Sequence, residues 1–249
     1  MKLEIGEAGV AVFRLQGGKA NAIDQAFIDR LGGLLDELQQ TDARALVITG
    51  YDRYFSAGLA LPALVGLDRR AMHRFITAFD DVMLRLFQCP LPTLAAINGH
   101  AIAGGCVLAL QADYRMMADG PAQIGLSEAQ LGIALPPIVI ETLRSQMPPA
   151  SLIPVAYEGR LLGPSVAVLL GLVHEVVPAA ELGARAVERV ARLAGAKGQA
   201  FAAIKHELRQ PAVAAIRQNS EGVERWLDCW FSDEGQAAIE QVVRKISKR

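Results

Sequence analysis

A glycine-rich turn between two apolar segments is the part of this 249-residue chain best suited to chemistry. The turn spans residues 98–110 and contains Gly99, Gly104 and Gly105, and a strand-like run at 93–97 precedes it. Glycine allows a ligand to approach the backbone closely. Amides at the start of a helix lack intrahelical acceptors and lie at the positive end of its dipole. We therefore expect this turn to present backbone N–H groups to a negatively charged atom.

The cysteines and histidines favour neither a disulfide framework nor a metal site. Cys89, Cys106 and Cys229 are widely spaced and odd in number, which is typical of a reducing compartment. Three of the histidines have no ligand spacing with one another or with carboxylates, so no metal is expected. His100, beside the glycine turn, is expected to pack or to form a hydrogen bond there.

Composition and charge exclude several classes of partner. Apolar residues make up 52% of the chain, enough for a sizeable core, and the net charge is −1. No global field would attract nucleic acid or an anionic membrane, although a local basic pocket for one phosphorylated ligand stays open. Residues 1–15 do not resemble a signal peptide, and no apolar run is long enough to span a membrane. We expect a soluble, cytoplasmic protein.

Strand-like and helix-like segments alternate along the first two thirds of the chain. Apolar runs predict strands at 3–5, 10–15, 45–49, 93–97 and 114–118. Helical periodicity predicts helices after Asp24, over 68–86 and from the proline pair at 136–137 to about 146. This alternation indicates an α/β core with mainly parallel pairing.

After residue 178 the pattern becomes helical, with apolar stripes within 182–194, 223–230 and 239–246. These stripes need a cover, which the core or a neighbouring subunit would supply. Trp226 and Trp230 are four residues apart and are expected to pack helices together rather than to bind a ligand.

Five motifs in order resemble those of the crotonase (enoyl-CoA hydratase/isomerase) superfamily, over nearly the whole chain. They are Phe55–Leu59, Ile97–Cys106, Ala112–Arg115, Glu128–Gly132 and Gly171–Val173. The resemblance implies a spiral core of ββα units over residues 1–178 and a helical trimerisation segment over 179–249. A homotrimer or a dimer of trimers is expected.

The resemblance also implies a ligand, an acyl-CoA thioester whose carbonyl oxygen lies between two backbone N–H groups. By motif position these belong to Leu59 and Gly104. Such donors stabilise an enolate oxygen, each by on the order of 3 kcal/mol in the transition state. Coenzyme A is part of this substrate, so no separate cofactor is expected. The alternative for Gly104 and Gly105 is tight packing of a helix on a sheet.

The reaction depends on which carboxylates face the acyl group. Hydratases of the superfamily use two glutamates, and the first is replaced here by Val107, whereas the second is present as Glu128. One carboxylate is enough to move a proton from C2 to C4 of a 3-enoyl-CoA, which matches the Δ3,Δ2-enoyl-CoA isomerase type. The apolar neighbours Leu126, Leu131 and Ile133 are expected to raise the pKa of this base.

Other outcomes stay open at this stage. Ala60 stands where the isomerases have Asp, and the Pro136–Pro137 pair replaces a glycine-rich continuation seen in hydratases. A decarboxylase, a hydrolase or a weak hydratase with a single glutamate is the closest alternative. A non-catalytic CoA-binding subunit is another, in which Glu128 would be a surface or helix-start carboxylate.

The resemblance further implies contacts with coenzyme A. The backbone of the first loop would frame the adenine, and a lysine of a C-terminal helix would meet the phosphates of this or a neighbouring subunit. The residues concerned are Lys19, Ala20, Ala22, Ser56, Ala57 and Lys205. For Lys19 the alternative is a solvated loop side chain.

Overall fold

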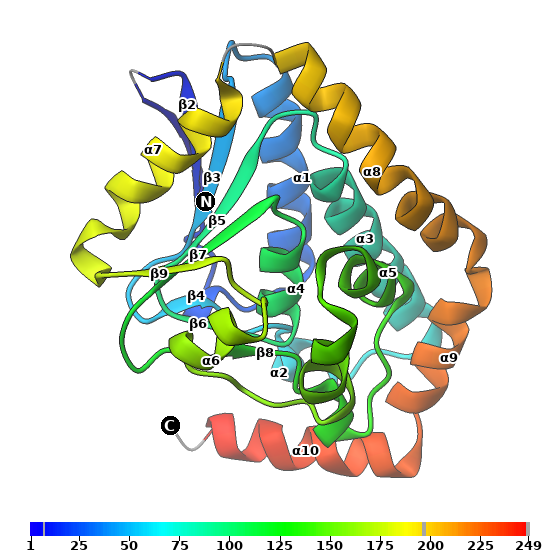
Figure 1. The fold of residues 1–249 in the computed structure, drawn as a ribbon. Helices are drawn as coiled ribbons and strands as arrows, with labels where there is room; N and C mark the ends of the chain where they lie inside the picture. The colour runs from blue at the N-terminus through cyan, green and yellow to red at the C-terminus, as the bar shows by residue number, and fades with distance from the viewer. Residues whose placement is uncertain (7, 196–197, 248–249) are drawn as a thin grey trace.

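A six-stranded sheet with the order β1-β2-β3-β5-β7-β9 forms the central layer of the computed structural model, which describes residues 1–6, 8–195 and 198–247 (Figure 1). Only β1 and β2 pair antiparallel, and every other neighbouring pair is parallel, as predicted. The strands are β1 (Lys2–Ile5), β2 (Val10–Arg14), β3 (Ala45–Thr49), β5 (Thr93–Ile97), β7 (Tyr114–Ala118) and β9 (Glu175–Val177).

A second, smaller parallel sheet carries the residues of the predicted site. Its strands are β4 (Tyr54–Ser56), β6 (His100–Ile102) and β8 (Ile124–Gly125). Each follows a strand of the large sheet in the chain, so β3-β4, β5-β6 and β7-β8 are successive strand pairs, and a helix follows each pair. This repetition is the predicted spiral of ββα units.

Helices surround both sheets, and their starts follow the sequence closely. Asp24 accepts a hydrogen bond from the Phe27 amide (2.8 Å), as expected of a capping residue. Asp68 accepts one from the Ala71 amide (2.7 Å), so it caps the helix that the sequence places over 68–86. The helices are α1 (Gln25–Gln39), α2 (Leu61–Leu64), α3 (Arg69–Phe87), α4 (Gly104–Leu110), α5 (Pro137–Gln146), α6 (Pro164–Leu169), α7 (Leu182–Ala194), α8 (Gly198–Gln218), α9 (Ser220–Trp230) and α10 (Asp233–Ser247).

Short helical turns complete the chain. They are η1 (Lys19–Asn21), η2 (Glu128–Leu131), η3 (Pro149–Ser151), η4 (Ile153–Tyr157) and η5 (Ala179–Glu181). Among the described residues, no helix combines the length and apolar character needed to cross a bilayer.

The large sheet is buried on both faces, which explains its continuous apolar strands. Leu46 and Ile48 of β3 point into the main core under α1 and α3, whereas Ala45 and Val47 point to the opposite face. There α7 covers β3, β5 and β7. Both faces of the sheet thus have a helical layer.

The chain does not divide into two packing units at residue 178. Helix α7 belongs to the sheet layers, and Trp226, Trp230 and Ile239 belong to the main core cluster. Helices α8, α9 and α10 run one after another around the outside of the core (Figure 1). The trimerisation role of 179–249 stays a prediction.

A largely buried carboxylate, that of Asp113, connects α8 to the sheet. It accepts hydrogen bonds from the amide (2.7 Å) and hydroxyl (2.9 Å) of Thr93, and it pairs with Lys205 (2.8 Å) and Arg209 (2.7 Å). Burial lowers the pKa of the Lys205 ammonium and of the Arg209 guanidinium, and the Asp113 charge opposes that shift. One carboxylate therefore compensates two buried cations.

Replacing Asp113→Asn is expected to destabilise the fold by about 3–5 kcal/mol, because both cations would lose their counter-charge. Urea unfolding measures this change. The matched control is Asp36→Asn, which breaks an exposed ion pair with Arg85 and should stay within about 1 kcal/mol of the parent protein. Equal, small effects of the two substitutions would contradict the role given to Asp113.

Candidate active site

The end of β4 and the start of α4 meet backbone to backbone. A Cβ atom at Gly105 would lie 2.2 Å from the Ser56 carbonyl oxygen, and one at Gly58 would lie 2.7 Å from that of Ile102. Gly58 also has a φ of +85°. Only glycine fits at these two positions. At Gly105 the structure therefore contains the tight packing of a helix on a sheet that the sequence left open as an alternative.

This close approach brings the amides of Leu59 and Gly104 side by side. A Cβ atom on Gly104 would lie 3.5 Å from the Leu59 nitrogen. Neither N–H donates to an acceptor within the described part of the chain. Gly104 is the first residue of α4, where an N–H has no intrahelical partner. The two predicted donors are thus neighbours, and both are free to bind one oxygen atom.

Backbone strain lies directly before Gly104. Ala103 has φ 50° and ψ −119°, a conformation that costs a non-glycine residue on the order of 1–3 kcal/mol. Its own amide donates to the Gly125 carbonyl (2.8 Å), which anchors it to β8. Because the Gly104 N–H belongs to the peptide plane after Ala103, this conformation sets the direction in which that N–H points.

Glu128 begins the turn η2 and lies in the same cavity as the two amides. Its Oε2 atom is buried and has no hydrogen-bond partner within the described residues. Burial raises the pKa of the carboxyl from 4.5 to about 7, with a small opposing effect from its own backbone N–H. This is the shift that the apolar neighbours predicted.

The cavity has a volume of about 290 Å³ and is otherwise apolar. Among the described lining residues, Glu128 is the sole ionisable one, and Ser127 is the one other whose side chain carries oxygen. Val107, whose side chain cannot carry a proton, also lines the cavity. The remaining lining residues are Ala57, Leu59, Leu61, Ile76, Phe79, Ile102, Ala103, Gly104, Leu131, Ile133, Pro136, Val139, Trp226, Trp230, Val242 and Ile246.

The family follows from comparison with known proteins. A family model described as enoyl-CoA hydratase/isomerase matches residues 6–240. The chain belongs to this family. It is an α/β protein of the crotonase fold, and relatives of the isomerase type are among the proteins it is similar to.

Individual relatives agree with this assignment. Human mitochondrial enoyl-CoA delta isomerase 1 is 29% identical over 245 residues, covering 97% of this chain and 81% of that protein. The crystal structure of human mitochondrial delta3-delta2-enoyl-CoA isomerase aligns with a TM-score of 0.93 at 28% identity, over 99% of this chain and 98% of that one. Carnitinyl-CoA dehydratase of Escherichia coli K12 is 33% identical over 211 residues, covering 82% of this chain and 80% of the dehydratase.

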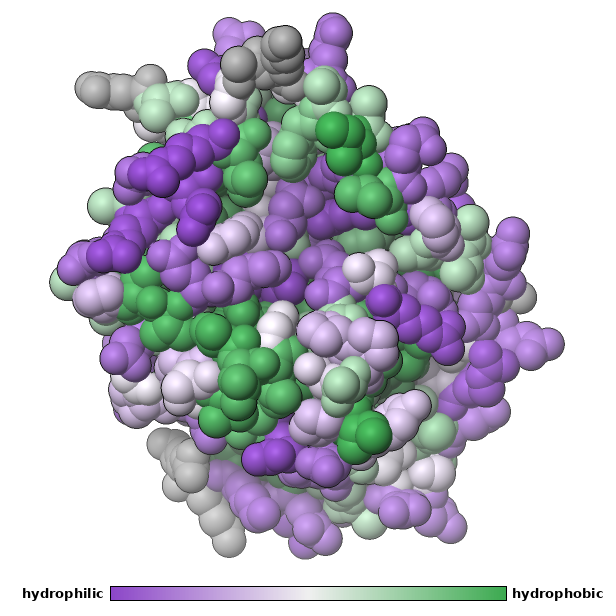
Figure 2. Space-filling model, in the orientation of Figure 1, coloured by the Kyte–Doolittle hydropathy of each residue, from purple (hydrophilic) through white to green (hydrophobic). Residues whose placement is uncertain are grey.

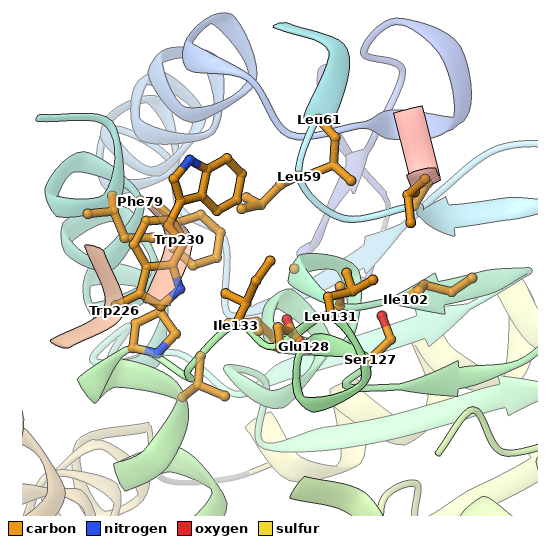
Figure 3. Close-up of a pocket in the computed structure, with 18 of the residues that line it drawn as sticks. Leu59, Leu61, Phe79, Ile102, Ser127, Glu128, Leu131, Ile133, Trp226 and Trp230 are labelled. Atoms are coloured by element: carbon orange, nitrogen blue, oxygen red, sulfur yellow. The ribbon is translucent and has the colours of Figure 1, made fainter. Parts of the chain in front are cut away.

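The predicted packing role of the two tryptophans is confirmed, and the structure adds a second position for their rings. Trp226 and Trp230 do pack α9 against the core, but their stacked rings, 5.1 Å apart, also line the cavity (Figure 3). Val242 and Ile246 of α10 line it as well. The apolar stripes of the C-terminal helices are the feature of the sequence that could have revealed this position. Part of the apolar surface that they form faces the cavity.

The first loop lies against β4, near the site. Ala20, which has a φ of 59°, accepts a hydrogen bond from the Ala57 amide (3.0 Å), and the Ala22 amide closes the turn onto Lys19 (3.3 Å). Ala57 lines the cavity. The buried Ser56 hydroxyl donates to the Asn21 carbonyl (2.7 Å), so this side chain holds the loop in place. The CoA contacts of this region stay a prediction.

Lys205 is not brought to the cavity. Its ammonium is buried against Asp113 (2.8 Å) and the Leu91 carbonyl (2.9 Å), and it does not line the space around Glu128. In this subunit Lys205 forms a structural ion pair, and its contact with the phosphates of coenzyme A stays a prediction. A lysine in a helical pattern does not reveal which carboxylate will fold against it.

Glu128 is expected to make the protein less stable as pH rises. The folded state holds the proton more tightly than the unfolded chain, so stability falls between pH 4.5 and about 7. Glu128→Gln cannot ionise, and it should unfold like the parent near pH 4 but be more stable by roughly 3 kcal/mol at pH 8. Urea unfolding at several pH values measures the gap. Glu234→Gln, at an exposed glutamate of α10, is the control. A difference in unfolding free energy between the two proteins that does not change with pH would contradict the raised pKa of Glu128.

Proposed function

We propose that this protein moves the double bond of a 3-enoyl-CoA to give the 2-enoyl-CoA, with Glu128 as the carrier of the proton. The observation that supports this most is the combination within one cavity of two unpaired amides with a lone carboxyl group. Coenzyme A would enter as part of the thioester, and the reaction would need no separate cofactor.

The proposed reaction is a proton transfer in two steps. The Glu128 carboxylate takes a proton from C2, and the electron pair moves into the conjugated system and onto the thioester oxygen. The N–H groups of Leu59 and Gly104 stabilise that oxyanion. The carboxylic acid then returns its proton at C4, and the double bond ends between C2 and C3. A pKa of about 7 suits both roles, because the group must accept and release the same proton.

Val107 argues against efficient hydration, because a second carboxylate to orient and deprotonate water is missing from the described cavity. The carnitinyl-CoA dehydratase relative supports hydratase-type chemistry as the second candidate. A decarboxylase or hydrolase with one glutamate, or a CoA-binding subunit without turnover, would be further alternatives. The buried, unpaired oxygen of Glu128 argues against a subunit without turnover, because burying this oxygen lowers stability and forms no structural contact in return.

Incubation with 3-enoyl-CoA and with 2-enoyl-CoA separates these functions. We expect conjugation to appear with the first substrate and no loss of conjugation with the second. The rate should fall as pH drops below about 7, where Glu128 becomes protonated. Glu128→Gln should reduce isomerisation by about 10²–10⁴-fold, and Glu234→Gln should leave it unchanged. Efficient hydration of 2-enoyl-CoA, or full activity of Glu128→Gln, would overturn the proposal.

We further propose self-association into a homotrimer or a dimer of trimers. Hydrophobic side chains gather on the surface over α6 (Figure 2). Leu169 of α6 is 82% exposed, and Val166, Ile153 and Tyr157 in α6 and η4 are also exposed. Such a patch on a protein surface is typical of an interaction site.

Leu169→Glu is expected to weaken the assembly, because burying the new charge at an interface is costly. Light scattering after size exclusion should give a mass three times that of the chain, or six times, for the parent. The variant should shift toward the monomer. Ile5→Glu, at an exposed apolar residue of β1, is the control and should not alter the mass. A monomeric parent protein would refute this part of the proposal.

A further inference from the structure

The cavity has two different ends. In Figure 3, Ile102 and Ser127 lie at one end and Phe79, Trp226 and Trp230 at the other, with Glu128 between them. If the reacting carbons of a ligand lie beside Glu128, a chain that extends away from Ile102 and Ser127 meets the aromatic rings. Those rings come from α3 and α9, outside the turn that presents the amides.

The aromatic end is a fixed wall. Phe79, Trp226 and Trp230 are each at most 2% exposed, so they are held in the main core as well as facing the cavity. Arg69 at the start of α3 binds Glu224 and Asp228 of α9, at 2.7 Å in each case. These two carboxylates flank Trp226 in the sequence, so exposed ion pairs connect the two helices of the wall beside it.

We infer that Phe79, Trp226 and Trp230 set the longest acyl chain that the cavity accepts, by closing the end that lies beyond Glu128. This inference rests on the proposed function only in taking an acyl-CoA as the ligand, and it does not require turnover. Each methylene that fits should strengthen binding about fourfold, and the gain should stop where the chain meets the rings.

The two tryptophans make this inference testable in the unmodified protein. They are the only tryptophans in the chain, and both line the cavity. Titration with saturated acetyl-, hexanoyl-, octanoyl- and dodecanoyl-CoA should leave tryptophan fluorescence unchanged for the shortest chain. It should change the emission once the tail reaches the rings. Identical fluorescence changes with acetyl-CoA and octanoyl-CoA would overturn the inference.

Substitution of the wall provides the second test. Phe79→Leu should raise the affinity for dodecanoyl-CoA relative to hexanoyl-CoA by about fourfold for each further methylene admitted, measured by calorimetry. Phe75→Leu is the matched control, because Phe75 is buried on the same helix but does not line the cavity. It should leave the ratio unchanged. An unaltered ratio in Phe79→Leu, or the same change in both variants, would overturn the inference.

These binding measurements separate the inference from the proposed function. Absence of isomerisation together with a chain-length limit in binding would refute the proposed reaction and leave the wall in place. Isomerisation without a chain-length limit in binding would support the proposed reaction and refute the inference about the wall.

Discussion

The contact between the end of β4 and the start of α4 is the constraint on which the site depends. The backbone there is so close that a side chain at Gly105 would overlap the Ser56 carbonyl, and one at Gly58 would overlap that of Ile102. Only this spacing places the amides of Leu59 and Gly104 beside one another. The ββα spiral makes that contact possible, because it brings β4, β6 and β8 into one small sheet. Along the chain, 43 residues lie between β4 and β6, and 21 lie between β6 and β8.

A stable core allows the site to hold groups that are unfavourable by themselves. The left-handed conformation of Ala103 and the unpaired Glu128 oxygen each cost free energy in the folded state. The apolar cores on the two faces of the large sheet supply compensating stability. Because the Glu128 carboxylate is unfavourable for folding but needed for the proposed reaction, Glu128→Gln is expected to increase stability and decrease activity.

The C-terminal helices complete the cavity that the spiral begins. Helix α10 contacts both α2 and η2, on the two sides of the cavity, and contributes Val242 and Ile246 to its lining. Helix α9 contributes the stacked tryptophans. The spiral motifs thus provide Glu128 and the two amides, and α9 and α10 contribute part of the cavity wall.

The sequence by itself determined the parts of this protein that depend on local patterns and on short motifs. The strands near 45–49, 93–97 and 114–118 and the cap at Asp24 are local, because propensity and a nearby hydrogen bond decide them. The motifs around residues 58, 104 and 128 were enough to predict an oxyanion site with one carboxylate. Tertiary structure alone decided the pairing of Lys205 with Asp113, 92 residues away, and the entry of Trp226 and Trp230 into the cavity wall. Both depend on which face of a late helix meets a distant surface, and helical periodicity identifies an apolar or charged face without identifying its partner.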